Sequence, residues 1–514
     1  MTDILANDGG FPILGALILL PLLAAMLLQF CTTDGSQRRL VLAATALELA
    51  LAVIALVGFT PGSSAIQYEQ TGLWMPLIGA AFHLGVDGIS IMFLPLTAFV
   101  ILMAILFSPA GGPGMGRFYW TNILLFQAFT MGIFCALDLL LFFVFWELIL
   151  IPSYFLIKLW GVGPQRHYAA LKYVNYMLVG SAPLLIAIVL LGNAYGDAVV
   201  AGLAPAGGNY NFVELLKVTI APETQGLIFG LMVLSFAIKA PVPPFHTWMP
   251  TVLMEGPVGM AILLVGLKLG TYGMLRLVLP LLPDASIAWQ PVMVWVGVAA
   301  MLYGGLIALS QFNLRRLLAF ASVSHVGLVL MGIFSLNAQG LQGSLMLMIN
   351  IGLTSTALMF LAGGLYRRTG STELSAFGGL AHAMPKLAFF FFAIGLATIG
   401  TPGTSGFYGE FSILWGAFET HWLLASVAVT GVVLSAGYFL WYYERAFFGP
   451  AGSARIAKLP DLSRQETGVM AVVLALVIGI GVYPAPLIER TAPSTAALAD
   501  RLEVRTVRVA LLEP

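Results

Sequence analysis

Two lysines stand inside apolar stretches of the sequence, where a positive charge is unusual. Lys239 closes the run LMVLSFAIK, and Lys268 interrupts the run MAILLVGLKLGTYGML. Placing a lysine in the hydrocarbon of a membrane costs about 2.5–3.5 kcal/mol on insertion scales, so such residues usually face a protein interior or a wet cavity. A lysine can also release its proton, which an arginine cannot do in a protein. Residue type and position therefore predict proton-carrying groups.

Lys268 is the stronger candidate of the two. The ends of its apolar run are each about ten residues away, and ten helical residues rise ~15 Å whereas a lysine side chain reaches only ~6 Å. The ammonium group is therefore too deep to extend to the membrane surface. No acidic residue lies within a helical turn of Lys268. We interpret Lys268 as a proton station and not as a surface anchor.

Two carboxylates lie in similar surroundings. Glu147 lies in FFVFWELILIPSYFLI, and Glu410 follows TIGTPGTSGFYG. Glu147 is a plausible partner of Lys239, because a nearby opposite charge favours the charged form of a group. Moving this carboxylate would then change whether the lysine holds its proton; the alternative is a structural ion pair. Glu410 is interpreted as a further proton carrier, or alternatively as a carboxylate that binds backbone amides at a helix break.

Three other ionisable residues complete the set. His246 and His325 are candidates for passing protons between lysines, because imidazole titrates near neutral pH, although each is alternatively a hydrogen-bonded core residue. Glu48 lies in an N-terminal apolar segment. We interpret it as a contact to a neighbouring subunit.

The composition indicates that these ionisable residues lie in a membrane protein. The chain has 514 residues, of which 60% are hydrophobic and 9% are charged, against roughly 25% charged in soluble domains. Its formal net charge is +0, which gives no support for nucleic-acid binding. The only two cysteines, Cys31 and Cys135, argue against a disulfide framework, an iron–sulfur site or a zinc site.

A membrane-spanning helix needs about 20 apolar residues. The sequence offers about fourteen candidate spans, at 11–30, 40–60, 86–108, 118–136, 139–160, 173–194, 226–240, 257–279, 288–310, 317–335, 342–366, 387–418, 421–447 and 467–488. KAPVPPFH closes the seventh span and TPGTSGFYGE interrupts the twelfth. Broken helices at matching positions of two halves are the usual sign of a transport site, whereas isolated proline kinks are common. Because the breaks are five spans apart, the sequence predicts five-helix repeats.

With these two repeats, the chain has four expected parts. We expect N-terminal helices in 1–117, a first repeat with a break near 240 in 118–285, a second repeat with a break near 403 in 286–450, and a last span with an amphipathic tail in 451–514. Loops on one side hold 15 of the 23 lysines and arginines, against 6 on the side of the termini. The positive-inside rule then puts both termini outside the cytoplasm. The tail from Thr491 is expected on the membrane surface or on a neighbouring subunit.

Five motifs identify a family. FWELILIPSYFLI, FAIKAPVPPFHTWMP, GLKLGTYGMLR, SVSHVGLVLMG and GFYGEFSIL resemble, in this order, the antiporter-like subunit M family of proton-pumping NADH–quinone oxidoreductase, respiratory complex I. The resemblance covers roughly residues 85–450. It implies an all-α membrane fold of fourteen helices with two inverted five-helix repeats, and a proton channel driven by quinone reduction in other subunits. It also implies that Glu147 pairs with Lys239, that Lys268 is the central lysine, and that Glu410 is the terminal residue, which is typically lysine in sister subunits L and N.

The resemblance implies an assembly in a bacterial inner membrane. This chain would hold no cofactor, whereas partner subunits would carry flavin and iron–sulfur clusters. Its neighbours would be other membrane subunits, including sister antiporter-like subunits, and lipid, with no nucleic acid.

Three positions depart from the family pattern. Leu253 and Ile351 stand where relatives often have histidine, and Asn313 stands where aspartate is common. We expect water to replace the missing relays beside the polar residues Ser324, Thr354 and Ser355. The departures leave three rival interpretations: a subunit of a Mrp-type cation/proton antiporter, a membrane module of an energy-coupled carbon-dioxide-hydrating complex, and a structural scaffold.

Overall fold

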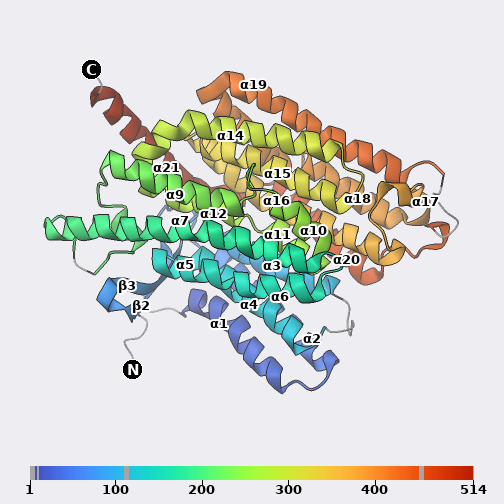
Figure 1. Cartoon of the computed structure of the whole chain (residues 1–514). Helices are drawn as coiled ribbons and strands as arrows, with labels where there is room; N and C mark the ends of the chain where they lie inside the picture. Colours follow the sequence, from blue (N-terminus) through green and yellow to red (C-terminus); the bar gives the residue numbers. More distant parts are fainter. Residues whose placement is uncertain (1–5, 8–10, 109–114, 206, 451–455, 513–514) are drawn as a thin grey trace.

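The computed structural model describes the chain except for residues 1–5, 8–10, 109–114, 206, 451–455 and 513–514. Its helices lie side by side along one common direction (Figure 1). Among the described residues, 11 helical segments are long and apolar enough to cross a membrane. They are Ile13–Phe30 (α1 and a 3-10 turn), Asp34–Gly58 (α2), Arg117–Cys135 (α4), Leu139–Trp160 (α5 and α6), Arg166–Val200 (α7), Val258–Leu281 (α11 to α13), Pro283–Leu309 (α14), Leu314–Ile333 (α15), Ala338–Thr369 (α16), Ser405–Phe447 (α19) and Arg464–Val482 (α20).

Shorter helices complete the bundle. These are Phe93–Phe107 (α3), Phe212–Leu215 (α8), Pro222–Lys239 (α9), Trp248–Glu255 (α10), Leu380–Ala383 (α17) and Pro385–Thr398 (α18). In α19 the backbone leaves the helical conformation at His421, with φ −142° and ψ 62°, between the expected spans that end at 418 and begin at 421. The helical membrane fold is thus confirmed, while the number of fourteen spans stays a prediction.

A small sheet was missed by the all-α prediction. Strands Ala6–Asn7 (β1), Gln67–Met75 (β2) and Ala80–Val86 (β3) form an antiparallel sheet in the order β1-β2-β3. Thr71 pairs with His83 in its register. The His83 side chain is buried, with Nε2 at 2.6 Å from Glu69 Oε1. The sheet lies at the same end of the bundle as α21 (Ala485–Leu512) (Figure 1).

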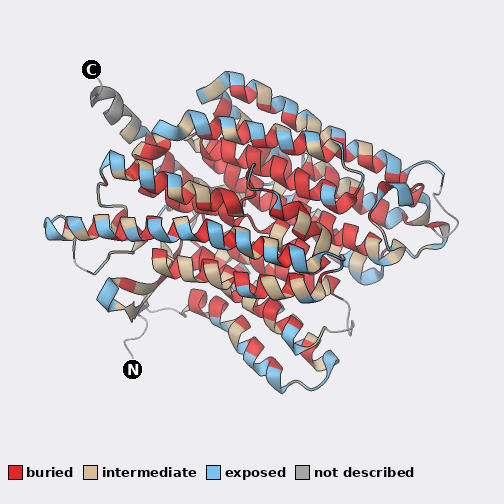
Figure 2. Ribbon diagram, viewed as in Figure 1, coloured by how far each residue is buried: buried red, intermediate tan, exposed pale blue. Residues whose placement is uncertain are grey.

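The core of the bundle is built from α11–α13, α15 and α16. In the most apolar 18-residue stretch of each, 94%, 94% and 100% of the residues are buried, against 28% for α2 and 17% for α20. Figure 2 shows that burial decreases from the centre of the bundle outward. Glycines let the central helices approach closely, as is common in membrane bundles. A Cβ atom on Gly327 of α15 would lie 2.5 Å from the carbonyl oxygen of Gly297 on α14.

A buried ion pair joins the sheet end to the segment that carries Lys268. Arg276 lies in a π-helical turn, Met274–Val278, within the expected span 257–279. Its Nη1 donates to Oδ2 of Asp87, which follows β3, and both side chains are buried. Asp87 Oδ1 also accepts from the backbone N–H of Ile89 at 3.0 Å and of Ser90 at 3.2 Å. The pair therefore fixes the start of α3 against the π turn.

The C-terminal helix α21 packs on this chain. Gln342 of α16 donates to Thr491 Oγ1 at 2.7 Å and accepts from Thr495 Oγ1 at 2.9 Å. Ser494 Oγ accepts from the backbone N–H of Gly88 at 3.0 Å. This part of the tail therefore binds the chain's own bundle, a contact that the sequence did not predict, while its position at the membrane surface or on a neighbouring subunit stays a prediction.

Candidate functional site

Lys268 lies at a helix break that the sequence did not predict. Helix α11 (Val258–Gly266) stops two residues before it, and α12 (Leu269–Gly273) begins one residue after it. Leu267 and Lys268 have ψ values of 113° and 56°, outside the helical range. The expectation of a continuous helix over 257–279 was wrong. The break depends on close packing, since the carbonyl oxygen of Phe236 lies only 2.5 Å from the place where a Cβ atom on Gly270 would be.

The Lys268 ammonium group has one hydrogen-bond partner among the described residues. Lys268 is 6% exposed, and its Nζ donates to Ser322 Oγ at 2.6 Å. His325 is one turn further along α15 and is buried, with the backbone of Thr398, the last residue of α18, beside its ring. A buried cation and an imidazole on adjacent turns form an arrangement that water could complete.

Ser322, the partner of Lys268, was not identified from the sequence. Ser324 was expected to replace a relay, but its hydroxyl donates to the Met301 carbonyl oxygen at 2.8 Å and thus faces α14. Ser322, two residues earlier, reaches Lys268. A rotation of 100° per residue separates these two faces of α15 by roughly 200°, and the sequence alone did not fix which face met the lysine.

Lys239 is the last residue of α9. Its Nζ lies 3.3 Å from the Trp146 carbonyl oxygen and 3.7 Å from the centre of the Trp146 ring. A cation over an indole ring is attracted by the electron density of the ring face. Glu147 and Lys239 form none of the ion pairs within 4.0 Å found among the described residues. The direct contact of Lys239 is therefore with the residue that precedes Glu147.

A cavity of about 30 Å³ lies between the two lysine-bearing segments. It is lined by Lys239 and by Leu267 and Leu269, the residues on either side of Lys268, with Tyr173 and Trp248 nearby. A volume of ~30 Å³ is the share of one water molecule in the liquid. The first helix break and the break at Lys268 thus border one water-sized space.

His246 is apart from this cavity. It lies in the turn between α9 and α10, with Nε2 at 3.1 Å from Tyr303 Oη. It lines a groove of about 580 Å³ together with Lys172, Glu255 and Arg316. The break itself is satisfied locally, since Val242 N–H donates to the Ala237 carbonyl oxygen at 2.9 Å.

Glu410 packs against the second helix break. This break separates α18, which ends at Thr398, from α19, which begins at Ser405. Glu410 is 5% exposed, and its carboxylate occupies the space that a Cβ on Gly400 would need. The break amides of Thr401 and Thr404 donate to backbone carbonyl oxygens, each at 3.1 Å. These two amides therefore do not need Glu410, which argues against the purely structural alternative.

Polar side chains flank this second break. Ser405 donates to Asn350 Oδ1 at 2.6 Å, and Thr354 on the same helix, α16, donates to the Asn350 carbonyl oxygen at 2.9 Å. Ser355 is buried on α16. Asn350 was not identified from the sequence, because an asparagine in a long apolar helix gives no signal of what it meets.

The three departures from the family pattern differ in kind. Leu253 and Ile351 are fully packed in the core, with exposures of 0% and 1%. Asn313 caps the N-terminus of α15, because its Oδ1 accepts from the N–H groups of Arg315 at 3.0 Å and Arg316 at 3.4 Å. Asparagine and aspartate are comparable caps. The change at 313 therefore keeps a structural role.

Glu48 is an internal residue, which corrects its interpretation as a subunit contact. It is 1% exposed, belongs to α2, and has the Gln127 side chain of α4 within hydrogen-bonding reach. Thr45 on α2 donates to Gln127 Oε1 at 3.2 Å. These residues form a small polar group separate from Lys239 and Lys268.

Comparisons with known proteins identify the family to which the chain is similar. Residues 136–435 match the family model described as NADH:quinone oxidoreductase/Mrp antiporter, transmembrane. NADH-ubiquinone oxidoreductase chain 4 of Arabidopsis thaliana is 35% identical over 92% of this chain and 94% of that protein. NADH-quinone oxidoreductase subunit M of Rhodobacter capsulatus is 34% identical over 95% of this chain and 96% of that protein.

Two solved structures have the same fold. A chain of respiratory complex I from Thermus thermophilus with bound NADH superposes with a TM-score of 0.86 at 30% identity, covering 96% of this chain and 100% of that one. A chain of the Mrp complex from Dietzia sp. DQ12-45-1b gives a TM-score of 0.81 at 24% identity, covering 97% of this chain and 100% of that one. At that identity the second likeness concerns the fold alone.

Proposed function

Because the chain belongs to the NADH:quinone oxidoreductase/Mrp antiporter family of membrane proteins, we propose that it is an antiporter-like membrane subunit of a complex-I-type assembly that moves protons across a bacterial inner membrane. Relatives named as NADH–quinone oxidoreductase subunit M match it over nearly their whole length. Partner subunits with flavin and iron–sulfur clusters would carry out the redox chemistry, and this chain would hold neither.

The break at Lys268 is the observation that carries the proposal. A buried lysine at an interrupted helix has freed backbone groups beside it, and such sites are tolerated where they line a cavity or water. The cavity of about 30 Å³ is on the Lys239 side, while Ser322 and His325 are on the other. Glu410 at the second break then ends the row.

Each residue of the row has a distinct task. A carboxylate near an ammonium group favours its charged form, so Glu147 close to Lys239 holds the proton there, and its withdrawal lets the proton leave. Lys268 would receive this proton through water in the intervening cavity. Ser322 stabilises the charged Lys268, and His325 with water would pass the proton towards Glu410. His246, at the open groove, would supply protons from the aqueous side.

The proposed architecture keeps the four parts derived from the sequence. Two inverted five-helix repeats, 118–285 and 286–450, would each contribute one broken helix, and the fourteen helices would place both termini outside the cytoplasm. The interruptions between α9 and α10 and between α18 and α19 support this proposal. The common location of the sheet and α21 at one bundle end supports the placement of the two ends of the chain (Figure 1).

The alternatives are less favoured. The full-length relatives at about a third identity are named as NADH dehydrogenase subunits, whereas the Mrp structure, at 24%, indicates only the fold. The same relatives favour the main interpretation over a carbon-dioxide-hydrating complex. Glu147, Lys239, Lys268, His325 and Glu410 are all present, although histidine is absent at positions 253 and 351, and this favours a working proton path over a decayed channel.

Substitution of Lys268 tests the proposal. Lys268→Ala should stop proton transport through this chain in proteoliposomes that contain the whole assembly, with the yield of the assembly measured in parallel. Lys268→Arg should fail as well, because a guanidinium group keeps its proton. A transport-competent Lys268→Arg assembly would identify Lys268 as a fixed charge and contradict the proton-carrier role.

A further inference from the structure

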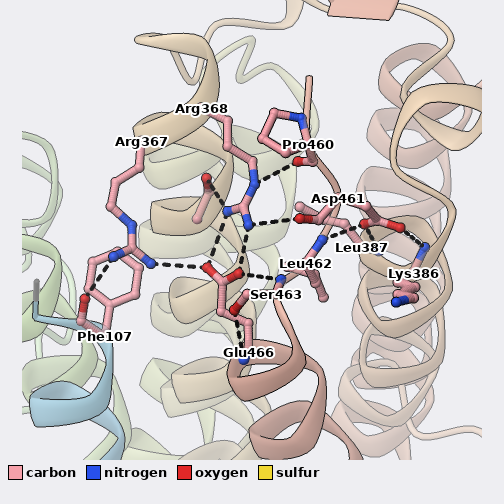
Figure 3. Close-up of polar contacts among 11 residues, drawn as sticks. Phe107, Arg367, Arg368, Lys386, Leu387, Pro460, Asp461, Leu462, Ser463 and Glu466 are labelled. Carbon is pink, nitrogen blue, oxygen red and sulfur yellow. Dashed lines mark hydrogen bonds and ion pairs between the residues drawn. The ribbon is translucent and has the colours of Figure 1, made fainter. Parts of the chain in front are cut away.

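Two arginines at the end of α16 hold the loop that leads into α20. Arg367 and Arg368 both bind Glu466, with nitrogen–oxygen distances of 3.1 Å and 2.6 Å. Arg368 also donates to the carbonyl oxygens of Pro460 at 2.9 Å and Asp461 at 3.1 Å. Figure 3 shows both guanidinium groups converging on the single carboxylate. Glu466 is therefore shared between two arginines. The group of Arg367, Arg368 and Glu466, called the clasp below, keeps a net positive charge.

The nearby acidic residue does not offset this charge. Asp461 accepts instead from the backbone N–H groups of Lys386 at 2.8 Å and Leu387 at 3.1 Å, at the N-terminus of α18. Its carboxylate points away from Arg368 (Figure 3). Asp461 is thus a helix-capping group, and the positive charge of the clasp stays uncompensated.

A third arginine faces the same space. Arg38 of α2, Arg367, Arg368, Ser463 and Glu466 line a cavity of about 450 Å³. The Nε of Arg38 is buried without a hydrogen-bond partner among the described residues. Three guanidinium groups and one carboxylate therefore line the cavity. Like charges at a shared site repel unless an anion lies between them.

The cavity opens where lipid would contact the protein. It lies between α2 and α20, the two least buried of the 11 apolar spans. Further along these helices Leu47 is 52% exposed and Val472 is 53% exposed, so apolar surface continues inward from the basic end. A basic cavity at the end of an apolar helical surface matches the charge and shape of a phospholipid.

We propose that this cavity binds the phosphate headgroup of an anionic phospholipid. Arg38 contacts the phosphate, Arg367 contributes charge, and the acyl chains lie along the exposed faces of α2 and α20. The inference requires only that the chain spans a membrane, and it is independent of proton movement along the lysine row.

Photo-crosslinking tests the site. The assembly containing the full chain is placed in phosphatidylcholine nanodiscs with a small amount of photoactivatable phosphatidylglycerol, and labelled peptides are located by mass spectrometry. Peptides around Arg38 and residues 460–466 should be labelled. Arg38→Gln should reduce this labelling about fivefold, because a basic residue near a membrane surface contributes an attraction of this size.

The neighbouring arginine provides a matched control. Arg39 is exposed and donates from Nε to the Gly35 carbonyl oxygen of its own helix at 3.2 Å. Arg39→Gln removes the same charge and should leave labelling unchanged, while Arg38→Lys should restore most of it. A thermal melt of each variant assembly separates loss of binding from loss of folding.

Three results would overturn the proposal. Equal labelling of the Arg38→Gln and Arg39→Gln assemblies would exclude a role for Arg38. Equally strong labelling by a photoactivatable phosphatidylcholine would exclude selection of the anionic headgroup. Loss of phosphatidylglycerol labelling in millimolar inorganic phosphate would identify a site for the free ion and not for a lipid.

Discussion

The buried pair of Asp87 and Arg276 allows a quantitative test of how the Lys268 segment is held. Asp87→Asn keeps a carbonyl oxygen that can accept from Ile89 and Ser90, and it removes only the charge. Arg276 is then left with the Phe212 ring, 4.6 Å from its guanidinium carbon. Breaking a buried ion pair by removing one partner costs about 3–5 kcal/mol, because a buried charge stays uncompensated. We expect Asp87→Asn to lie near the upper end of this range.

The reverse substitution should cost less. Arg276→Gln leaves the Asp87 carboxylate with its two backbone N–H donors, and charge-assisted hydrogen bonds to backbone amides are among the stronger ones. We expect a loss of about 3 kcal/mol, at the lower end of the range for a broken buried pair. The double variant removes both charges, so it should be no less stable than Asp87→Asn alone.

The measurement is the free energy of unfolding of the purified chain in mixed micelles, obtained for each variant by denaturant titration. Glu214→Gln is the matched control, since Glu214 forms an ion pair of 2.6 Å with Lys217, whose side chain is 64% exposed. An exposed pair of this kind contributes roughly 0–1 kcal/mol. Losses in the two buried single variants that are below about 1 kcal/mol, or that simply add in the double variant, would refute the reasoning.

Three further predictions concern transport, packing and topology. Glu147→Gln should strongly reduce proton transport with normal assembly yield and Glu147→Asp should retain part of it; normal transport by Glu147→Gln would leave that residue a structural role at most. Glu48→Gln should change the unfolding free energy by less than about 1 kcal/mol, because a neutral isostere avoids burying a charge; a larger loss would mean that the carboxylate charge itself is needed. Cysteine labelling should find both termini outside the cytoplasm and the loop 451–466 inside it. Residues 451–455 of this loop lie outside the described residues. Termini on opposite sides of the membrane would contradict the prediction of two five-helix repeats.

Much of the fold followed from the sequence because hydrophobic length and proline- or glycine-rich breaks are local signals. The breaks at 240 and 403 are of this kind. The break at Lys268 was not found, because leucine and glycine neighbours are compatible with a helix and the interruption depends on packing against Phe236 and Thr356. The sheet was missed for a similar reason: β2 and β3 lie between apolar spans, the three strands pair with each other, and Leu84 of β3 also bridges to Ala136 after α4.

The candidate site was predictable in its residue types but not in its contacts. A lysine in an apolar run is informative by itself, so Lys239 and Lys268 were found directly. Ser322 could not be chosen over Ser324 without knowing the rotation of α15. Glu48 was misplaced because an acidic residue in an outer helix can face inward as well as outward, and only the packing of α2 on α4 decides.

Helix α21 gives the molecule a mechanical property. It binds Leu56 on α2 through Arg490 Nε at 3.2 Å, Gln342 on α16 through Thr491, and the Leu216 carbonyl oxygen after α8 through Arg501 at 2.7 Å. These three anchor points lie in residues 1–117, 286–450 and 118–285. One helix therefore acts as a strap across these three parts, and any motion that separated them at this end would have to break its hydrogen bonds. If the chain carries protons as proposed, the accompanying movements are expected in side chains and helix breaks away from this strapped end.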